Sequence, residues 1–365
     1  MCPKRSTSIF AAILASVIVF ISCRKEPSVV THRDSAEIPV LDERTDPFPV
    51  SPNIYLATLG RVLFYDKELS LNKNISCGSC HKQENAFTDN LQFSPGTNNL
   101  HTKRNTPSIF AKNGRLFWDG RSFSMSDLAL RPVRDEVEMD HDDIDALIGR
   151  ISRLDYYKPL FSRAFPNRSR VDSNMIKDAL AEFLRNFAFA DNKFHRSQKG
   201  IDKLNPSEEM GRNLFFGKAK CSLCHHIVPD FSNNGYGVTD ESHNIGLDIV
   251  NKDRGVGAIT GLPQDEGAFM MPVLLNVELT APYMHDGRFK TLEEVVEHYN
   301  SEIKNNPNLD HLLRTYDYNT GTHIPLKLNL TGQEKKALVD FLKTLTDPSV
   351  LTDKRFSNPF VTRES

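Results

Sequence analysis

The chain has 365 residues, of which 39% are hydrophobic and 25% are charged, ordinary values for a globular protein long enough for two domains. Its formal net charge of -2 leaves no basic excess, so charge gives no case for binding to nucleic acid. The charge balance therefore indicates no particular class of partner.

The N-terminal segment is typical of a secretory signal. Basic residues precede an apolar run at residues 9–21, which is too short to span a bilayer. We expect residues 1–22 to be a signal peptide that is removed. The next residues look like a bacterial lipoprotein cleavage site with Cys23 as the lipid anchor, and ordinary signal cleavage nearby is the alternative. Either way the folded part works in the periplasm, and residues 23–50 are expected to form a tether.

Two stretches of the chain carry the same short pattern. Both read G-R-x-L-F-aromatic and then reach C-x-x-C-H, with cysteine pairs at Cys77/Cys80 and Cys221/Cys224. The other two cysteines lie in the leader. In an oxidising compartment four cysteines would usually suggest two disulfides, but here a histidine follows each pair directly.

The C-x-x-C-H pattern suits covalent attachment of haem. Two close thiols can bond both vinyl groups, and the histidine can bind iron on the proximal side. We therefore predict two c-type haems, with His81 and His225 as iron ligands. Zinc and a redox-active C-x-x-C are weaker alternatives, since zinc would want further ligands at suitable spacing. His226 cannot reach the iron that its neighbour binds.

The repetition extends beyond the cysteines. FWDGR at residues 117–121 and MHDGR at 284–288 each follow their own C-x-x-C-H by tens of residues. We predict a mainly α fold with two cytochrome c-like haem domains related by duplication. The domains are expected at 51–205 and 206–347, with a C-terminal tail at 348–365.

Helical periodicity supports the mainly α prediction. Apolar residues at Ile176, Leu180, Phe183, Leu184 and Phe187 predict one helix. A capping box at Thr331 and Glu334 begins another, with Leu338, Phe341, Leu342 and Leu345 on one face.

From about residue 51 to residue 347 the chain resembles the bacterial dihaem cytochrome c peroxidases. The matching stretches are CGSCH, KRNTPS, FWDGR, VEM, CSLCH and LTAPYMHDGRFKTLEEVVEHYN. The resemblance implies a peroxidatic haem in the N-terminal domain, an electron-transfer haem in the C-terminal domain and a calcium ion at their interface. It also implies reduction of hydrogen peroxide to water with electrons from a small cytochrome c or copper protein. A homodimer is compatible with the resemblance.

Two residues gain a catalytic role from the resemblance. Trp118, the only tryptophan, matches the tryptophan between the haems, although a core aromatic is the common role for this residue type. Glu138 of VEM matches the distal glutamate, which moves a proton between the peroxide oxygens. Acidic residues surround Glu138, and an acidic run is usually a solvated face; Glu136 is its nearest competitor.

The sequence leaves the identity of the sixth ligand of the second haem iron undecided. The capping box Thr291-x-x-Glu294 begins a helix whose spacing turns Tyr299 inward and His298 onto the face of Thr291 and Glu294. Family peroxidases commonly carry methionine at the position of Tyr299, whereas the related dihaem oxidase that forms tryptophan tryptophylquinone carries tyrosine. We predict Tyr299 as the ligand, with Met284 or a merely packed tyrosine as alternatives.

Further ligands follow from the resemblance. Many family members have a distal histidine on the first haem, but His101 does not match its spacing, so we expect an open site. The family's calcium ligands match Asn105, Thr280 and Pro282, and oxygen ligands suit that hard cation.

The function favoured by these residues is a periplasmic dihaem peroxidase. One alternative is a dihaem oxidase that uses bis-Fe(IV) chemistry to modify a partner protein, for which Tyr299 is the favourable feature. Another is a dihaem electron carrier or sensor, against which Glu138 argues.

Overall fold

The computed structural model describes residues 38–39, 53–110, 114–188, 191–227, 236–237 and 241–361. The expected signal peptide, the expected lipid anchor Cys23 and all of the expected tether except two residues lie outside the described residues.

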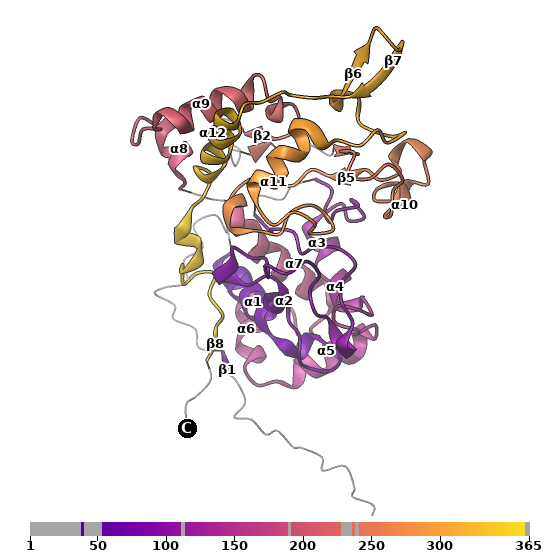
Figure 1. Ribbon diagram of the computed structural model, residues 1–365. Coiled ribbons are helices and arrows are strands. Elements are labelled where there is room, and N and C mark those ends of the chain that lie inside the picture. The colour runs from indigo at the N-terminus through magenta and orange to yellow at the C-terminus, as the bar shows by residue number, and fades with distance from the viewer. Residues whose placement is uncertain are drawn as a thin grey trace, which may run out of the picture. The chain divides into compact units, whose positions relative to one another are not determined.

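Helices are the main regular elements of the described chain, so the mainly α prediction is confirmed (Figure 1). They are α1 (Ile54–Tyr65), α2 (Cys77–Cys80), α3 (Met125–Leu128), α4 (Arg131–Arg134), α5 (Ile144–Arg153), α6 (Tyr157–Ala164), α7 (Ser173–Arg185), α8 (Lys193–Gln198), α9 (Pro206–Phe216), α10 (Gly257–Thr260), α11 (Leu292–Glu297) and α12 (Gly332–Lys343).

The strands of the described residues form small antiparallel pairs. They are β1 (Ile38–Pro39) with β8 (Phe360–Val361), β2 (His226–Ile227) with β3 (Tyr236–Gly237), β4 (Ser242–His243) with β5 (Phe269–Met270), and β6 (Arg314–Asp317) with β7 (Thr322–Pro325). Within the described ranges, no helix is long and apolar enough to cross a bilayer.

The first G-R-x-L-F sequence lies in α1, which crosses α7 at close range. A Cβ atom added to Gly60 would lie 2.0 Å from the carbonyl oxygen of Ala179 and 2.7 Å from Cβ of Phe183. Glycine is therefore required here because the two backbones touch. The predicted helix over residues 176–187 is confirmed as α7, with Phe187 in a 3-10 turn that follows it.

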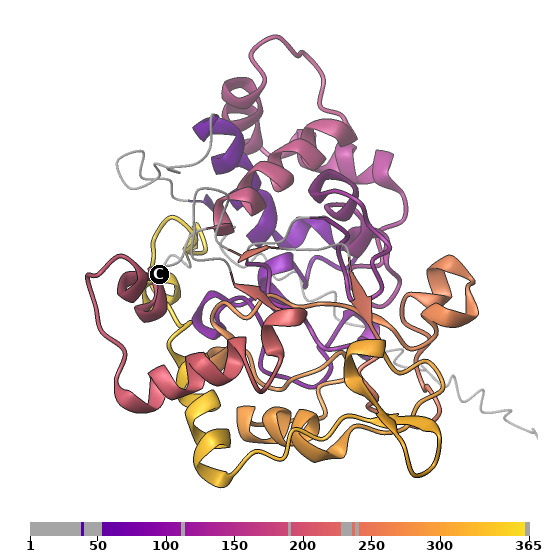
Figure 2. The same cartoon turned by 90° about the horizontal axis from the view of Figure 1, so that it is seen from above.

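The second G-R-x-L-F sequence repeats this arrangement. It lies in α9, which packs beside α12, as Figures 1 and 2 both show. A Cβ atom on Gly211 would lie 1.9 Å from the carbonyl oxygen of Ala337 and 2.7 Å from Cβ of Phe341. In both pairs the partner helix thus presents an alanine and, four residues later, a phenylalanine to the glycine.

Helix starts follow the capping chemistry of the sequence. The boxes Thr291/Glu294 and Thr331/Glu334 are both formed, and each begins the predicted helix. Asn205 caps α9, and Pro206 occupies its first turn, where the missing N–H has no helical partner to lose.

The segment expected as a tail packs against the first half of the chain. Val350 and Phe356 are buried, and the yellow end of the chain runs from α12 toward the violet N-terminal helices in Figure 1. Ile38 and Pro39 of the expected tether pair with Val361 and Phe360. Tertiary contacts therefore fix this segment, although its sequence shows no strong periodicity.

Candidate active site

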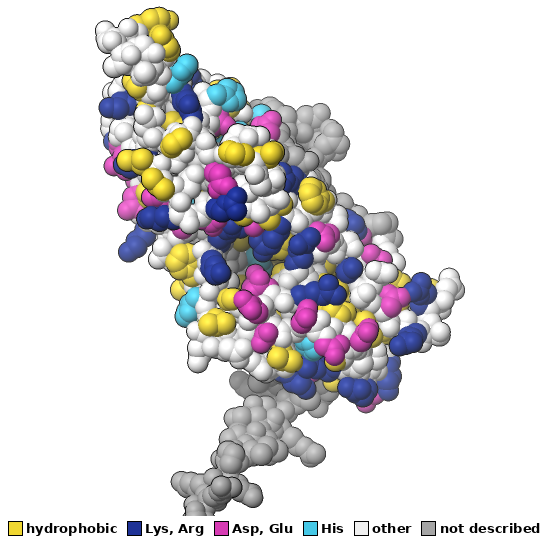
Figure 3. Space-filling model, turned by 90° about the vertical axis from the view of Figure 1, so that its right-hand side faces the viewer, with side chains coloured by type: hydrophobic (Ala, Val, Ile, Leu, Met, Phe, Trp, Pro, Cys, Tyr) yellow, Lys and Arg dark blue, Asp and Glu magenta, His cyan; other side chains and the backbone are white. Residues whose placement is uncertain are grey.

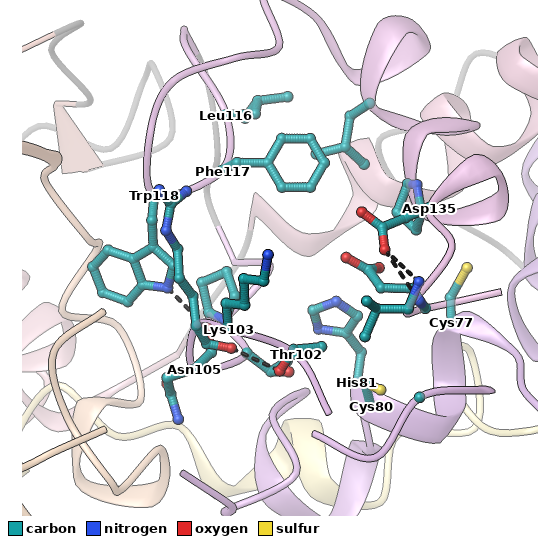
Figure 4. A pocket seen from close by; sticks show the side chains of 18 of the residues that line it. Cys77, Cys80, His81, Thr102, Lys103, Asn105, Leu116, Phe117, Trp118 and Asp135 are labelled. Atoms are coloured by element: carbon teal, nitrogen blue, oxygen red, sulfur yellow. Dashed lines mark hydrogen bonds between the residues drawn. The ribbon is translucent and has the colours of Figure 1, made fainter. Parts of the chain in front are cut away.

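The first C-x-x-C-H sequence borders a cavity of about 860 Å³. Cys77, Cys80, His81, Trp118 and Glu138 all line it. In Figure 4 the His81 ring points into this cavity, and the indole of Trp118 lies across it from the two cysteines. The structure thus brings together the residues that the sequence analysis assigned to the peroxidatic site.

Local helical structure places the thiols and the histidine. Helix α2 is one turn long, and the backbone N–H of His81 donates to the carbonyl of Cys77 at 2.9 Å. The His81 Nδ1 atom donates to the carbonyl oxygen of Phe87 at 2.9 Å, which leaves Nε2 for an iron ion. Burial lowers the pKa of His81, so the ring is neutral, as a metal ligand must be.

The lining of this cavity fits a covalent haem. Both cysteines are free thiols. Basic side chains that could pair with haem propionates also border it, namely Lys103, Arg104, Arg121, Lys252 and Arg254. On the face seen in Figure 3, Lys and Arg side chains gather across the middle and Asp and Glu side chains lie beside them. That face therefore carries both signs of charge.

Glu138 is the carboxyl group of this cavity whose pKa is strongly raised. Burial and the nearby carboxylate of Asp135 raise it to about 7, and the guanidinium of Arg121 opposes them in part. The backbone N–H groups of Val137 and Glu138 donate to Asp135 Oδ1 at 2.9 and 3.2 Å. A partly desolvated carboxyl with a pKa near neutral pH can both take and give a proton.

The competing candidates lie elsewhere. Glu136 borders the same cavity but its side chain is exposed. His101 is exposed and is not among the residues that line the cavity, which agrees with the spacing argument against it.

Trp118 lies between the first cavity and a second one. It lines both, and its Nε1 donates to the carbonyl oxygen of Asn105 at 2.8 Å. Its own carbonyl accepts from the backbone N–H of Met270 at 2.8 Å, a residue of the second half. The indole is therefore fixed from both halves of the chain.

The second cavity is smaller, about 200 Å³, and is lined by Cys221, Cys224 and His225. The backbone N–H of His225 donates to the carbonyl of Cys221 at 2.9 Å, which matches the bond in the first C-x-x-C-H. Burial lowers the pKa of His225 to about 4, so this ring is neutral as well. Its two thiols are also free, so a second covalent haem fits the same donor set.

Tyr299 and Met284 both line the second cavity. Helix α11 ends at Glu297, and Tyr299 lies in a π-helical turn over His298–Glu302. Such turns often occur at functional sites. Burial raises the pKa of the Tyr299 phenol, so the neutral form is favoured where no cation is bound.

The expected place of His298 is wrong. The side chain is 2% exposed, and its Nε2 lies 2.9 Å from the carbonyl oxygen of Ile245, whereas Thr291 and Glu294 are exposed. The loop that carries Ile245 covers His298, so the side chain is buried although Thr291 and Glu294 are exposed. His298 is not among the residues that line the second cavity.

The expected calcium ligands come together at the second cavity. Asn105, Thr280 and Pro282 all line it, although they come from distant parts of the sequence. The amide nitrogen of Asn105 donates to the carbonyl of Leu91 at 2.8 Å, which directs the amide. Carbonyl and amide oxygens are suitable ligands for calcium.

Several residues of the site were not identified from the sequence. His285 lines both cavities and stacks on Phe269 with ring centroids 3.7 Å apart. His243 lines the second cavity, and its hydrogen bond to Asp310 raises its pKa to about 10. His285 lies inside the repeated MHDGR sequence, so that motif was the available signal.

An ionic network joins the two halves beside the first cavity. Arg104 bonds Asp119 at 2.5 Å and Asp253 at 2.7 Å, and Arg121 bonds Asp119 at 3.0 Å. The network connects KRNTPS and FWDGR to a loop of the second half. These matched stretches thus also form the contact between the halves.

Comparison with known proteins gives consistent matches. A sequence model described as di-haem cytochrome c peroxidase matches residues 55–203. The chain is 31% identical over 325 residues to the cytochrome c551 peroxidase of Nitrosomonas europaea, with 86% of each chain covered. It is 29% identical over 307 residues to the methylamine utilization protein MauG of Methylophilus methylotrophus, with 82% of this chain and 85% of that protein covered. The crystal structure of a MauG-like protein associated with microbial copper homeostasis matches with a TM-score of 0.74 and 32% identity, covering 88% of this chain and 96% of that one.

Proposed function

We propose that this chain reduces hydrogen peroxide to water with electrons from a small cytochrome c or copper protein. The premise is that the chain belongs to the di-haem cytochrome c peroxidase family of oxidoreductases. The observation that carries the proposal is Glu138, a half-buried carboxyl whose pKa is raised to about 7 by desolvation in the cavity that His81 borders. An electron carrier without peroxide chemistry has no use for such a group.

Two haem sites are proposed from the two cavities. Cys77, Cys80 and His81 hold one haem in a domain over residues 51–205. Cys221, Cys224 and His225 hold the other in a domain over residues 206–347. When bound, the first haem supplies an iron that binds peroxide and exchanges electrons, and the second stores an oxidising equivalent.

Glu138 moves the proton that peroxide cleavage requires. In the ionised form Glu138 would accept a proton from one peroxide oxygen, and it would then deliver this proton to the other oxygen, which leaves as water. A pKa of about 7 suits both steps, because neither form is strongly favoured at neutral pH. Desolvation and then the carboxylate of Asp135 raise this pKa, and the guanidinium of Arg121 lowers it in part.

Trp118 is proposed to carry electrons between the two sites. It lines both cavities, and hydrogen bonds from its indole and its backbone fix its orientation. The electron donor is proposed to deliver electrons to the second site, from which Trp118 passes them to the first.

A second candidate function is oxidation of a partner protein. Tyr299 favours it, since an anionic oxygen ligand would lower the potential of the second haem and favour higher oxidation states of its iron. Similarity to the methylamine utilization protein MauG supports the same candidate. Tyr299 is the proposed sixth ligand, and Met284 in the same cavity is the alternative.

Calcium is proposed at Asn105, Thr280 and Pro282. These three residues all line the second cavity, which supports the site. A calcium ion bound there would hold the two halves of the chain in register beside Trp118. Metal analysis of purified holoprotein should find one calcium per chain, and finding none after purification without chelators would remove this part of the proposal.

The two domains are proposed to have arisen by duplication. The matched crossings of α1 with α7 and of α9 with α12 support this, since each requires a glycine facing an alanine and a phenylalanine. The periplasmic location and the lipid anchor at Cys23 remain proposals from the sequence.

Steady-state kinetics test the function. The holoprotein, with two haems verified by a pyridine haemochrome assay, should oxidise reduced cytochrome c rapidly when peroxide is added. Negligible donor turnover with a long-lived oxidised state after peroxide would favour the oxidase instead. A protein that does not react with peroxide at all would remove both candidates.

A further inference from the structure

We propose that the C-terminal strap, residues 347–361, positions His81 and thereby sets how strongly His81 binds the iron of the first haem. The strap does so by holding the proximal loop, residues 82–88, whose Phe87 carbonyl accepts the hydrogen bond from His81 Nδ1 at 2.9 Å. This inference rests on the proposed haem site at Cys77, Cys80 and His81.

The proximal loop is held in a conformation that its sequence does not favour. Ala86 and Phe87 are consecutive residues with left-handed backbone angles, φ 51° and 61°. Neither is glycine, and a bulky residue rarely adopts this region. Such strain persists only where the surroundings fix the backbone, and it is concentrated at functional sites. This conformation aims the Phe87 carbonyl at His81.

The strap contacts the proximal loop at both ends. At the start of the loop, Gln83 Nε2 donates to the carbonyl oxygens of Val350 and Asp353, each at 2.8 Å. At its end, the ring of Phe356 lies 6.3 Å from the ring of Phe87 and 4.5 Å from that of Phe187, which itself packs on Phe87 at 4.6 Å. The rings of Phe87 and Phe187 are almost completely buried, so the packing leaves little freedom.

The strap is itself fixed to helix α1. The hydroxyl of Tyr65 donates to the carbonyl of Phe356 at 2.6 Å, and Arg61 Nη1 donates to the carbonyl of Lys354 at 3.0 Å. These donors come from the helix that begins the first half, so the strap is tied to the same frame that carries α2 and His81.

The other end of the strap begins at the wall of the second cavity. The backbone N–H of Asp347 donates to Asn276 Oδ1 at 2.7 Å. Asn276 directly precedes Val277, which lines the second cavity. The strap therefore connects the wall of the second cavity to the hydrogen-bond partner of His81, in addition to the contact through Trp118.

The hydrogen bond from Nδ1 determines the ligand strength of His81. A carbonyl acceptor on the far nitrogen of a ligating histidine fixes the ring orientation and makes the imidazole a stronger donor to the metal. A stronger donor stabilises the oxidised iron. Loosening the proximal loop should therefore raise the reduction potential of the first haem and weaken its iron–histidine bond.

The experiment compares two variants of the full-length holoprotein. Phe356→Ala removes the packing at the end of the loop, and Gln83→Met removes the hydrogen bonds at its start with little change of size. Phe161→Ala in α6 is the control, since it truncates a buried phenylalanine of the same half whose ring packs on Tyr157. The readouts are the midpoint potential of each haem and the iron–histidine stretching frequency of the ferrous first haem.

We expect Phe356→Ala and Gln83→Met to raise the potential of the first haem and lower its iron–histidine frequency, with the potential of the second haem unchanged. Phe161→Ala should lower the unfolding midpoint without moving either potential. If Phe356→Ala fails to fold, Gln83→Met decides alone. If a folded variant with two haems keeps the wild-type potential and the wild-type iron–histidine frequency of the first haem, the inference is wrong. A wild-type protein with fewer than two covalent haems would instead overturn the proposed haem sites.

Discussion

Replacing Glu138 with glutamine should make the protein more stable at high pH. Burial and Asp135 raise the pKa of Glu138 from 4.5 to about 7, and one pKa unit corresponds to about 1.4 kcal/mol. Keeping this group ionised in the folded protein therefore costs roughly 3 kcal/mol. Because the folded pKa lies above the unfolded value, the cost is absent below pH 4.5, grows between 4.5 and 7 and is constant above that.

The assay is urea unfolding of wild-type and Glu138→Gln holoproteins at about pH 4 and about pH 8. The two proteins should have similar stability at the lower pH, and the variant should be more stable by roughly 3 kcal/mol at the higher pH. Glu136→Gln is the matched control, since this exposed neighbour should change stability by less than about 0.5 kcal/mol at either pH.

The same substitution should remove most of the peroxidase activity. Loss of a positioned acid–base group typically lowers the rate by about 10²–10⁴-fold, so kcat/KM for peroxide should fall in this range while both haem spectra stay unchanged. Equal turnover in wild type and variant would refute the catalytic role. A stability difference that does not grow with pH would refute the raised pKa.

Four further substitutions test the rest of the site. Asp135→Asn removes the negative charge beside Glu138, so its pKa falls and the rise of kcat/KM with pH should occur at lower pH; an unshifted profile would count against this coupling. Trp118→Phe should slow electron transfer between the haems after rapid mixing with peroxide, without altering either spectrum, and an unchanged rate would exclude the indole as the route. Tyr299→Phe should change the EPR spectrum of the oxidised second haem, while Met284→Leu should not; the reverse result would identify Met284 as the ligand.

Features set by short-range geometry could be predicted from the sequence. A single helical turn brings Cys77 and Cys80 to the same cavity as His81, so the C-x-x-C-H spacing alone is sufficient. The capping boxes at Thr291 and Thr331 likewise depend on atoms three residues apart.

Features set by packing between distant segments could not be predicted in the same way. Glu136 and Glu138 lie in one acidic run, yet Glu136 is exposed whereas Glu138 is half-buried, and this desolvation raises the pKa of Glu138. Residues from other parts of the chain line the same cavity and decide this difference. Phe356 lies in a sequence without periodicity and is buried by phenylalanines far from it in the chain. The surroundings of His298 were mistaken because its partner, the carbonyl oxygen of Ile245, lies in a loop 53 residues away in the sequence.

The difference between the two halves supports the proposed division of roles more strongly than their similarity does. Both C-x-x-C-H sequences share a 2.9 Å bond from the histidine N–H to the first cysteine carbonyl, although the first forms an α-helical turn and the second a 3-10 turn. The surroundings differ: the first cavity is about 860 Å³ and includes a carboxyl poised near pH 7, whereas the second is about 200 Å³ and is lined by Tyr299 and Met284. Peroxide needs both space and a proton carrier, and only the first cavity offers a carboxyl of this kind among its described lining residues. A shared haem-binding motif can therefore serve two different functions, according to what lies on the far side of each cavity.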